Sequence, residues 1–175
     1  MTGCDTMNGR RNKIIEADLQ SVLDEGGNVW AIGDVHGYAQ TLVTLLHSLE
    51  LTPKDRVVLL GDLVDRGPNS CEVIRIAREN PLIYSILGNH EDMMLRSFDV
   101  DNIGMVTNQQ KNWFYVGGRA TNQSYIDEFT NSNGDLEDFD LRMRVGRDLA
   151  WLDSLPHHIV LEDFRLVHAG YSPWD

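Results

Sequence analysis

The sequence predicts an α/β fold in which parallel strands alternate with helices. Three short apolar runs, at residues 28–33, 56–61 and 82–88, have the composition of buried strands. A helical pattern of apolar residues follows each run, at 38–50, 70–80 and 91–98. Repeated strand–loop–helix units imply parallel strands joined by right-handed crossovers, with helices on both faces of the sheet.

The segments on either side of these units complete one predicted domain, residues 1–175. Residues 1–12 are polar and are expected to be disordered, and the apolar spacing at 13–25 predicts a helix that ends at a glycine pair. Residues 98–155 change character and are expected to form a helical insertion or cap, broken at Gly117-Gly118 and at 131–134. Two short strands are expected after it, within 157–170.

Composition and charge exclude several classes of protein. The 175 residues carry a formal charge of −12, which argues against a nucleic-acid surface and against docking on anionic lipid. No apolar run approaches the length of a membrane span. Two cysteines without CxxC spacing, Cys4 and Cys71, fit a reducing compartment, so a cytoplasmic protein is expected.

Polar clusters led by glycine follow each predicted strand. In sheets of this kind the ligand site lies beyond the carboxyl ends of the strands. Asp34 and His36 leave the first strand two positions apart, and in extended backbone such residues project to the same side. Later strand ends supply an acid, an amide and two imidazoles: Asp62, Asn89, His90 and His168.

Carboxylate, amide and imidazole together suit Mn²⁺, Fe or Zn²⁺ better than Mg²⁺ alone. No thiolate belongs to the set, which argues against a structural zinc site. Each cluster by itself also has a plainer explanation. Gly-Asp and Asn-His are common in turns, His168 could be a satisfied histidine near the core, and Asp65-Arg66 could be a surface ion pair.

Four motifs carry a resemblance to a known family. GDVHG at 33–37, GDLVDRG at 61–67, GNHE at 88–91 and HAGYSP at 168–173 resemble the motifs of the calcineurin-like metallophosphoesterases. Asp65-Arg66-Gly67 and Glu91 resemble the serine/threonine protein phosphatase branch, especially its small bacterial and phage members. The resemblance covers residues 29–175 and implies a layered α/β-β sandwich.

The resemblance also implies a role for each matching residue. Asp34 and His36 would bind a first divalent metal ion, Asp62 would bridge two ions, and Asn89 and His168 would bind the second. His90 would protonate the leaving alkoxide, with Asp65 paired to its ring. Arg66, together with Asn89, would bind the phosphoryl oxygens.

The implied activity is a metal-dependent phosphoester hydrolase that uses a dinuclear centre, expected to hold Mn²⁺ with Fe or Zn²⁺ as alternatives, to activate water for direct attack on phosphate. Its substrates would be phosphoproteins, phosphopeptides or small phosphoesters. The neighbouring branch, the symmetrical dinucleoside tetraphosphatases, is the alternative. That branch usually resembles GDLVARG, with alanine where this chain has Asp65. A catalytically impaired or non-catalytic metal-binding fragment is the third possibility.

The sequence departs from the family at its carboxyl end. The family's last metal ligand, a histidine in a Gly-His-Thr-like turn, and a second phosphate-binding arginine follow the HAG strand, but the chain stops at Asp175. We therefore expect a truncated phosphatase, with a naturally short protein as the alternative, whose sheet lacks its last strands and exposes an edge. We also expect it to be much less active than a full-length relative.

Overall fold

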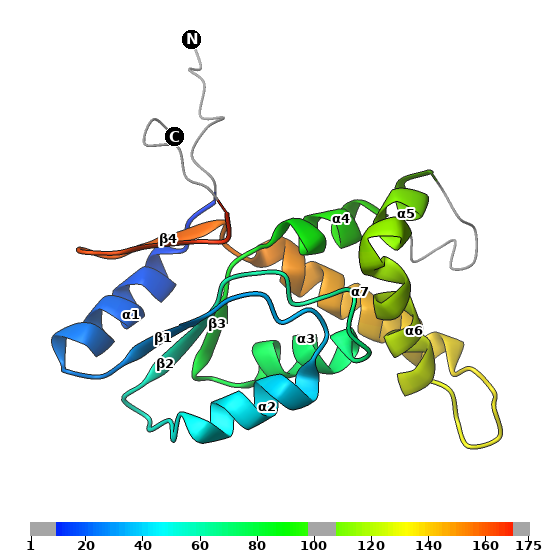
Figure 1. Cartoon of the computed structure of the whole chain (residues 1–175), viewed down its shortest axis with the longest axis horizontal. Helices are drawn as coiled ribbons and strands as arrows, with labels where there is room; N and C mark the ends of the chain where they lie inside the picture. Colours follow the sequence, from blue (N-terminus) through cyan, green and yellow to red (C-terminus); the bar gives the residue numbers. More distant parts are fainter. Residues whose placement is uncertain (1–9, 98–107, 170–175) are drawn as a thin grey trace, which may run out of the picture.

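The computed structural model describes residues 10–97 and 108–169, which form a parallel sheet, an antiparallel strand pair and the helices around the parallel sheet (Figure 1). The strands are β1 Val29–Ile32, β2 Arg56–Leu59, β3 Ile83–Ser85, β4 His158–Val160 and β5 Arg165–Val167. The helices are α1 Lys13–Asp24, α2 Ala39–Ser48, α3 Ser70–Glu79, α4 Asn89–Ser97, α5 Asn108–Trp113, η1 Phe114–Gly118, α6 Arg119–Glu128 and α7 Asp138–Ser154. No helix in these two ranges is both long enough and apolar enough to cross a bilayer.

The predicted parallel sheet is confirmed. Its strand order is β1-β2-β3, with Val29 opposite Arg56 and Val57 opposite Ile83. The second sheet is the antiparallel pair β4-β5. Because β1, β2 and β3 run in the same direction, the loops that follow them all leave from the carboxyl ends of the strands, on one side of the molecule. The polar clusters lie in these loops.

The central strand β2 is buried on both faces, as expected for a parallel sheet between two layers. On one face Val57 and Leu59 join a core cluster formed mainly with α2, α3, α6 and α7. On the other face Val58 joins a smaller cluster with Leu19 of α1 and Ile159 of β4. Figure 1 shows the sheet between α2 and α3 on one side and the layer of α1 and β4 on the other. This arrangement agrees with the α/β-β layering that the sequence implied.

Strand β1 lies at an edge of the sheet. Among the strands of the described ranges it pairs with β2 alone. Its Trp30 is 40% exposed, and the next residue, Ala31, is exposed as well. A groove of about 190 Å³ beside it is lined by Ile32, Asp34, Val35, Tyr38, Thr41, Leu42 and Leu45. The edge that we expected from missing last strands at the carboxyl end is a different one and stays a prediction.

Residues 10–12 do not behave as the loose terminus that we expected. Asn12 caps α1, because its side chain accepts hydrogen bonds from the backbone N–H groups of Ile14 and Ile15. Arg10 accepts the backbone N–H of His157 through its carbonyl at 2.7 Å. Residues 10–12 are therefore held in place by the start of α1 and by the segment before β4. Residues 1–9 lie outside the described residues.

The described part of the expected insertion, residues 108–154, is helical. Helices α5 and α6 are joined by η1, where the chain kinks at Gly117, whose φ of 130° is not helical. The expected break at Gly117-Gly118 is therefore present at Gly117, and helix resumes at Arg119. The turn that contains Gly134 separates α6 from α7 as predicted. Residues 98–107 of the expected insertion lie outside the described ranges.

A buried polar network attaches α7 to α3 and α6. The carboxylate of Asp148, which is fully buried, accepts hydrogen bonds from Arg144 at 2.7 Å and from the hydroxyl of Tyr125 at 2.8 Å. Arg78 of α3 also donates to it. Burial raises the pKa of Tyr125 well above its ordinary value, and the carboxylate beside it acts in the same direction. The network leaves the buried charges paired and fixes α6 against the core.

Candidate metal centre

The loops after β1 and β2 are joined by backbone hydrogen bonds. The N–H groups of Val35 and His36 both donate to the carbonyl of Asp62, at 3.0 and 2.8 Å, and Gly37 N–H donates to Leu63 at 2.8 Å. The first loop turns sharply, because His36 has φ 46°. Our expectation that Asp34 and His36 share a side in extended backbone is therefore wrong in its reason. They come together through a turn, with His36 Nε2 at 3.6 Å from Asp34 Oδ2.

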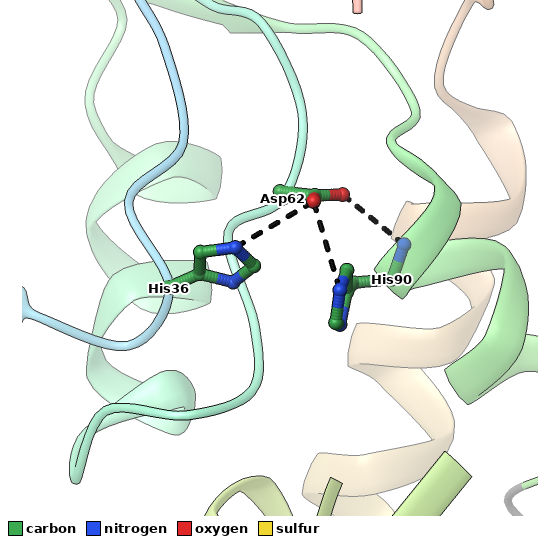
Figure 2. Close-up of side chains that lie close together, drawn as sticks. All are labelled: His36, Asp62 and His90. Carbon is green, nitrogen blue, oxygen red and sulfur yellow. Dashed lines mark hydrogen bonds and ion pairs between the residues drawn. The ribbon is translucent and has the colours of Figure 1, made fainter. Parts of the chain in front are cut away.

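Asp62 lies at the centre of the site, and its side chain is only 6% exposed. Its Oδ2 is 3.6 Å from His36 Nε2 and 3.8 Å from His90 Nε2 (Figure 2). Its Oδ1 accepts the backbone N–H of His90 at 3.1 Å, at the amino end of α4, and lies 3.3 Å from His168 Nε2. Both carboxylate oxygens thus face imidazole nitrogens that come from different strand ends.

The side chains form two groups that share Asp62. In one group, ligand atoms of His36, Asp62 and His90 all lie within 4.8 Å of one another. In the other, the same holds for Asp34, Asp62 and His168. A carboxylate common to two such groups has the arrangement of a bridging ligand between neighbouring cations. The structure therefore brings together residues separated by more than a hundred positions in the chain.

The donor set fits divalent cations. The Nδ1 atoms of His36 and His168 lie 2.8 Å from the carbonyl oxygens of Val64 and Leu60, which can only accept, so each ring carries its proton on Nδ1. Each Nε2 faces Asp62, and that of His36 accepts an N–H of Arg66. Anchoring one imidazole nitrogen on a carbonyl while the other faces the ion is the usual outer-shell arrangement of metal-binding histidines.

Asn89 and Asp34 lie at the open side of this set. Asn89 Oδ1 is 2.8 Å from His168 Nε2, and the residue is exposed at the start of α4. We expected helix only from Glu91, but α4 begins two residues earlier, at Asn89. The side chain of Asp34 is 56% exposed and borders the groove next to β1. Both groups are therefore accessible to a ligand from solvent.

His90 and Asp65 form a buried pair. Their contact joins His90 Nδ1 and Asp65 Oδ2 at 2.7 Å, and both side chains are almost completely buried. Arg66 extends along the solvent side, with Nη1 at 2.7 Å from His36 Nε2 and Nη2 at 3.1 Å from His90 Nε2. Because a guanidinium can only donate, His90 Nε2 accepts and its Nδ1–H donates to Asp65. The alternative that Asp65 and Arg66 form a surface ion pair is not what the structure has.

Glu91 is a residue whose structural role our sequence analysis missed. Its fully buried carboxylate accepts four backbone N–H groups: Asp62 and Gly88 on Oε2, and Leu63 and Val64 on Oε1. Burial raises its pKa to about 7, against the lowering effect of these hydrogen bonds. Glu91 therefore joins the loops after β2 and β3. An acid in the first turn of a helix that follows Gly-Asn was the available signal.

Gly88 is required by the same close packing. A Cβ at this position would lie 2.3 Å from the backbone nitrogen of Asp62 and 2.4 Å from its Oδ1. Any side chain here would displace the central carboxylate. Two other residues that sequence reasoning did not assign to the site, Trp113 and Thr121, donate hydrogen bonds to Asp65. Residues 170–173 of the HAGYSP motif lie outside the described ranges.

Comparisons with known proteins agree with this geometry. Residues 27–174 match the family model described as calcineurin-like phosphoesterase. "Serine/threonine-protein phosphatase 2" of Escherichia coli is 37% identical over 101 residues, which are 57% of this chain and 46% of that protein. Its namesake in Salmonella typhimurium is 35% identical over 160 residues, covering 89% of this chain and 63% of the relative.

A second group of relatives has another name. "Bis(5'-nucleosyl)-tetraphosphatase, symmetrical" of Cronobacter sakazakii is 35% identical over 153 residues, or 85% of this chain and 45% of that protein. The crystal structure of a candidate diadenosine tetraphosphatase superposes with a TM-score of 0.51 at 26% identity, over 84% of this chain and 52% of the other. The chain thus spans about half the length of most of these relatives.

Proposed function

The chain belongs to the calcineurin-like phosphoesterase family, and from that premise we propose that it is a metal-dependent phosphomonoesterase acting on phosphoserine and phosphothreonine. The observation that carries the proposal is the Asp65–His90 pair, 2.7 Å between Oδ2 and Nδ1, with Arg66 beside it. An acid–imidazole pair next to a phosphate-matched guanidinium is what the cleavage of an alkyl phosphate requires. The chain covers about half the length of most relatives. That the chain has the activity of a whole relative is therefore part of the proposal.

Two divalent cations are the proposed cofactors, with Mn²⁺ preferred and Fe or Zn²⁺ as alternatives. Asp34, His36 and Asp62 would hold one, and Asp62, Asn89 and His168 would hold the other. When bound, such a pair supplies Lewis acidity and a nucleophile from water near neutral pH. The distances from His36 Nε2 to Asp34 and Asp62 support the first set, and those from His168 Nε2 to Asp62 and Asn89 support the second.

Arg66 and Asn89 are the proposed phosphate-binding residues. The guanidinium of Arg66 donates to His36 and His90 in the absence of substrate, so its donors already point into the site. A planar fork of N–H groups matches two oxygens of a phosphoryl group, which a lysine would not reproduce. Phosphoryl oxygens would then replace the imidazole nitrogens as acceptors of the Arg66 N–H groups.

His90 is the proposed general acid. Its Nδ1–H is engaged by Asp65, so Nε2 is the atom that would deliver a proton to the departing oxygen. The carboxylate of Asp65 would compensate the positive charge of the doubly protonated ring. A serine or threonine alkoxide is a poor leaving group, and positioned proton transfer is worth about 10²–10⁴-fold in such reactions.

Hydrolysis of symmetrical dinucleoside tetraphosphates is the second candidate, because several relatives carry that name. A nucleoside diphosphate leaves far more readily than an alkoxide, so that reaction depends less on a general acid. The buried Asp65–His90 pair therefore favours the monoesterase, as does the alanine that the tetraphosphatase branch usually has in place of Asp65. A cytoplasmic location stays a prediction.

The test compares turnover of a phosphoserine peptide and of diadenosine tetraphosphate by the Mn²⁺-loaded chain. We expect the peptide to be preferred, and both activities to be lost in Asp62→Asn together with bound metal. His90→Ala should abolish peptide turnover, whereas His47→Ala, at an exposed position on α2, should match the wild type. Preference for the tetraphosphate would overturn the substrate assignment. Bound metal without hydrolysis of either compound would overturn the enzyme assignment.

A further inference from the structure

We propose that Trp113 and Thr121 are positioning residues for the general acid and act on His90 through Asp65. The proposal rests on the role proposed above for His90. Both residues belong to the helical segment 108–128, which lies far along the chain from the strand-end loops. The observation behind it is that these two side chains, together with His90, surround the carboxylate of Asp65.

The carboxylate of Asp65 accepts hydrogen bonds on both oxygens. The indole Nε1–H of Trp113 donates to Oδ1 at 3.0 Å and to Oδ2 at 2.8 Å. The hydroxyl of Thr121 donates to Oδ1 at 2.7 Å, and His90 Nδ1–H donates to Oδ2 at 2.7 Å. All four side chains are almost completely buried. Water therefore cannot replace these donors without a rearrangement of α5 and α6.

Thr121 holds the backbone of Asp65 as well as its carboxylate. The backbone N–H of Asp65 donates to Thr121 Oγ1 at 2.8 Å, and Ser70 Oγ is 3.1 Å from the same N–H. Asp65 has φ 74°, a conformation that residues other than glycine seldom adopt. One hydroxyl thus bridges the N–H and the carboxylate of a single residue. This restricts the rotation of the Asp65 side chain in a strained turn.

The orientation of His90 follows from these contacts. In these contacts Trp113 and Thr121 donate and the carboxylate of Asp65 accepts. Oδ2 of Asp65 therefore acts as an acceptor towards His90 as well. His90 must then direct Nδ1–H towards Asp65, which turns Nε2 towards Asp62 and Arg66. If Trp113 or Thr121 is removed, the carboxylate gains freedom to rotate and the ring of His90 loses its fixed orientation.

The same helical segment also supports Arg66. The backbone N–H of Arg66 donates to the carbonyl of Gly117 at 3.2 Å. A Cβ at Gly117 would lie 2.9 Å from Cγ of Arg66, so the two chains are in close contact at the bend in the helix. The insertion therefore contacts both residues of the Asp65-Arg66 pair, one through side chains and the other through its backbone.

The first test measures how the rate depends on the leaving group. In Thr121→Val and Trp113→Phe we expect kcat for phenyl phosphate, whose phenolate is a poor leaving group, to fall about 10-fold or more. We expect kcat for p-nitrophenyl phosphate to fall much less, because p-nitrophenolate leaves without help from an acid. KM should change little. Thr121→Ser keeps the hydroxyl and should restore the wild-type ratio of the two rates. Trp151→Phe, a half-buried tryptophan of α7, is the matched control.

The second test does not depend on activity. Nitrogen-15 NMR of the metal-free chain reports the proton on His90 Nδ1, with the resonance assigned from its loss in His90→Gln. We expect a slowly exchanging Nδ1–H in the wild type and in Thr121→Ser. In Thr121→Val and Trp113→Phe it should exchange rapidly. The wild type should also show a nuclear Overhauser effect between His90 Nδ1–H and the indole N–H of Trp113, because both donate to Asp65 Oδ2.

The outcomes separate this proposal from the proposed function. An equal fall in the rates for both esters, or unchanged NMR signals in the two variants, would overturn the positioning role. If the variants fail to fold, the wild-type nuclear Overhauser effect decides, and its absence overturns the proposal. If the wild type hydrolyses no phosphoester, the proposed function fails while the NMR results still decide whether Asp65 orients His90 as described.

Discussion

Replacing Glu91 by glutamine tests the origin of the central loop geometry. The carboxylate of Glu91 accepts two backbone N–H groups on each oxygen. An amide of the same shape has one oxygen and one NH₂ group. Whichever way the amide turns, its NH₂ group faces two N–H donors, either those of Asp62 and Gly88 or those of Leu63 and Val64. The substitution therefore leaves two buried donors without an acceptor and adds a repulsive contact.

The size of the effect follows from the number of orphaned groups. An unsatisfied buried polar group costs about 1–3 kcal/mol, so Glu91→Gln should lower the free energy of unfolding by about 2–6 kcal/mol. A domain of this size has a total stability of about 5–15 kcal/mol, so the loss would be large. Affinity for Mn²⁺ should fall as well, because Asp62 lies in the loop that Glu91 holds.

Urea denaturation followed by circular dichroism at pH 8, above the pKa of about 7 for Glu91, measures the loss. The matched control is Glu72→Gln on the exposed side of α3, where Glu72 pairs with Arg75 at the surface. We expect the control to change stability by less than about 1 kcal/mol. A loss in Glu91→Gln no larger than that of the control would refute the argument that this carboxylate holds the two loops together.

Three further predictions concern stability and metal binding. Asp148→Ala should destabilise the chain by about 3–5 kcal/mol in urea denaturation, because it leaves buried partners of a charge network unpaired; a loss below about 1 kcal/mol would contradict this. Glu16 has a pKa of about 2, because hydrogen bonds from two basic side chains and a backbone N–H outweigh the raising effect of burial. Since the folded pKa lies below the ordinary 4.5, the carboxylate stabilises the fold above that pH by up to about 3 kcal/mol and loses this as pH falls towards 2. Denaturation midpoints at pH 3 and pH 6 should therefore differ less in Glu16→Gln than in the wild type, and equal differences would count against it. Gly88→Ala should abolish Mn²⁺ binding, measured by calorimetry, because its methyl group would displace Asp62, whereas Gly146→Ala, which has open space, should bind normally.

The parallel sheet and the position of the site were predictable from local patterns. Apolar runs followed by helical spacing specify strand and helix, and parallel strands bring their carboxyl ends to one edge whatever the loops contain. Asp34, Asp62 and Asn89, which follow the three parallel strands, could thus be expected to meet, whereas His168 follows β5 of the antiparallel pair. The helix break at Gly134 was predictable for a similar reason, since the conformational preference of glycine is a local property.

Other features depend on the tertiary structure. The approach of His36 to Asp34 depends on a turn with positive φ, which the two-residue spacing alone did not indicate. The four hydrogen bonds to Glu91 join it to loops that are up to 29 residues away, and no local pattern reports such partners. The contact between Asp65 and Thr121 spans 56 residues and depends on how α6 packs against α3.

The amino-acid sequence by itself determined the order of strands and helices, the chemistry of the strand-end side chains and the family to which they belong. These are properties of short segments, set by the period of apolar residues and by residue type. The tertiary structure alone decided which buried groups satisfy one another: the N–H groups held by Glu91, and the indole and hydroxyl that hold Asp65. Hydrogen bonds between distant segments depend on distance and direction in space, and these exist only once the helices have packed against the sheet.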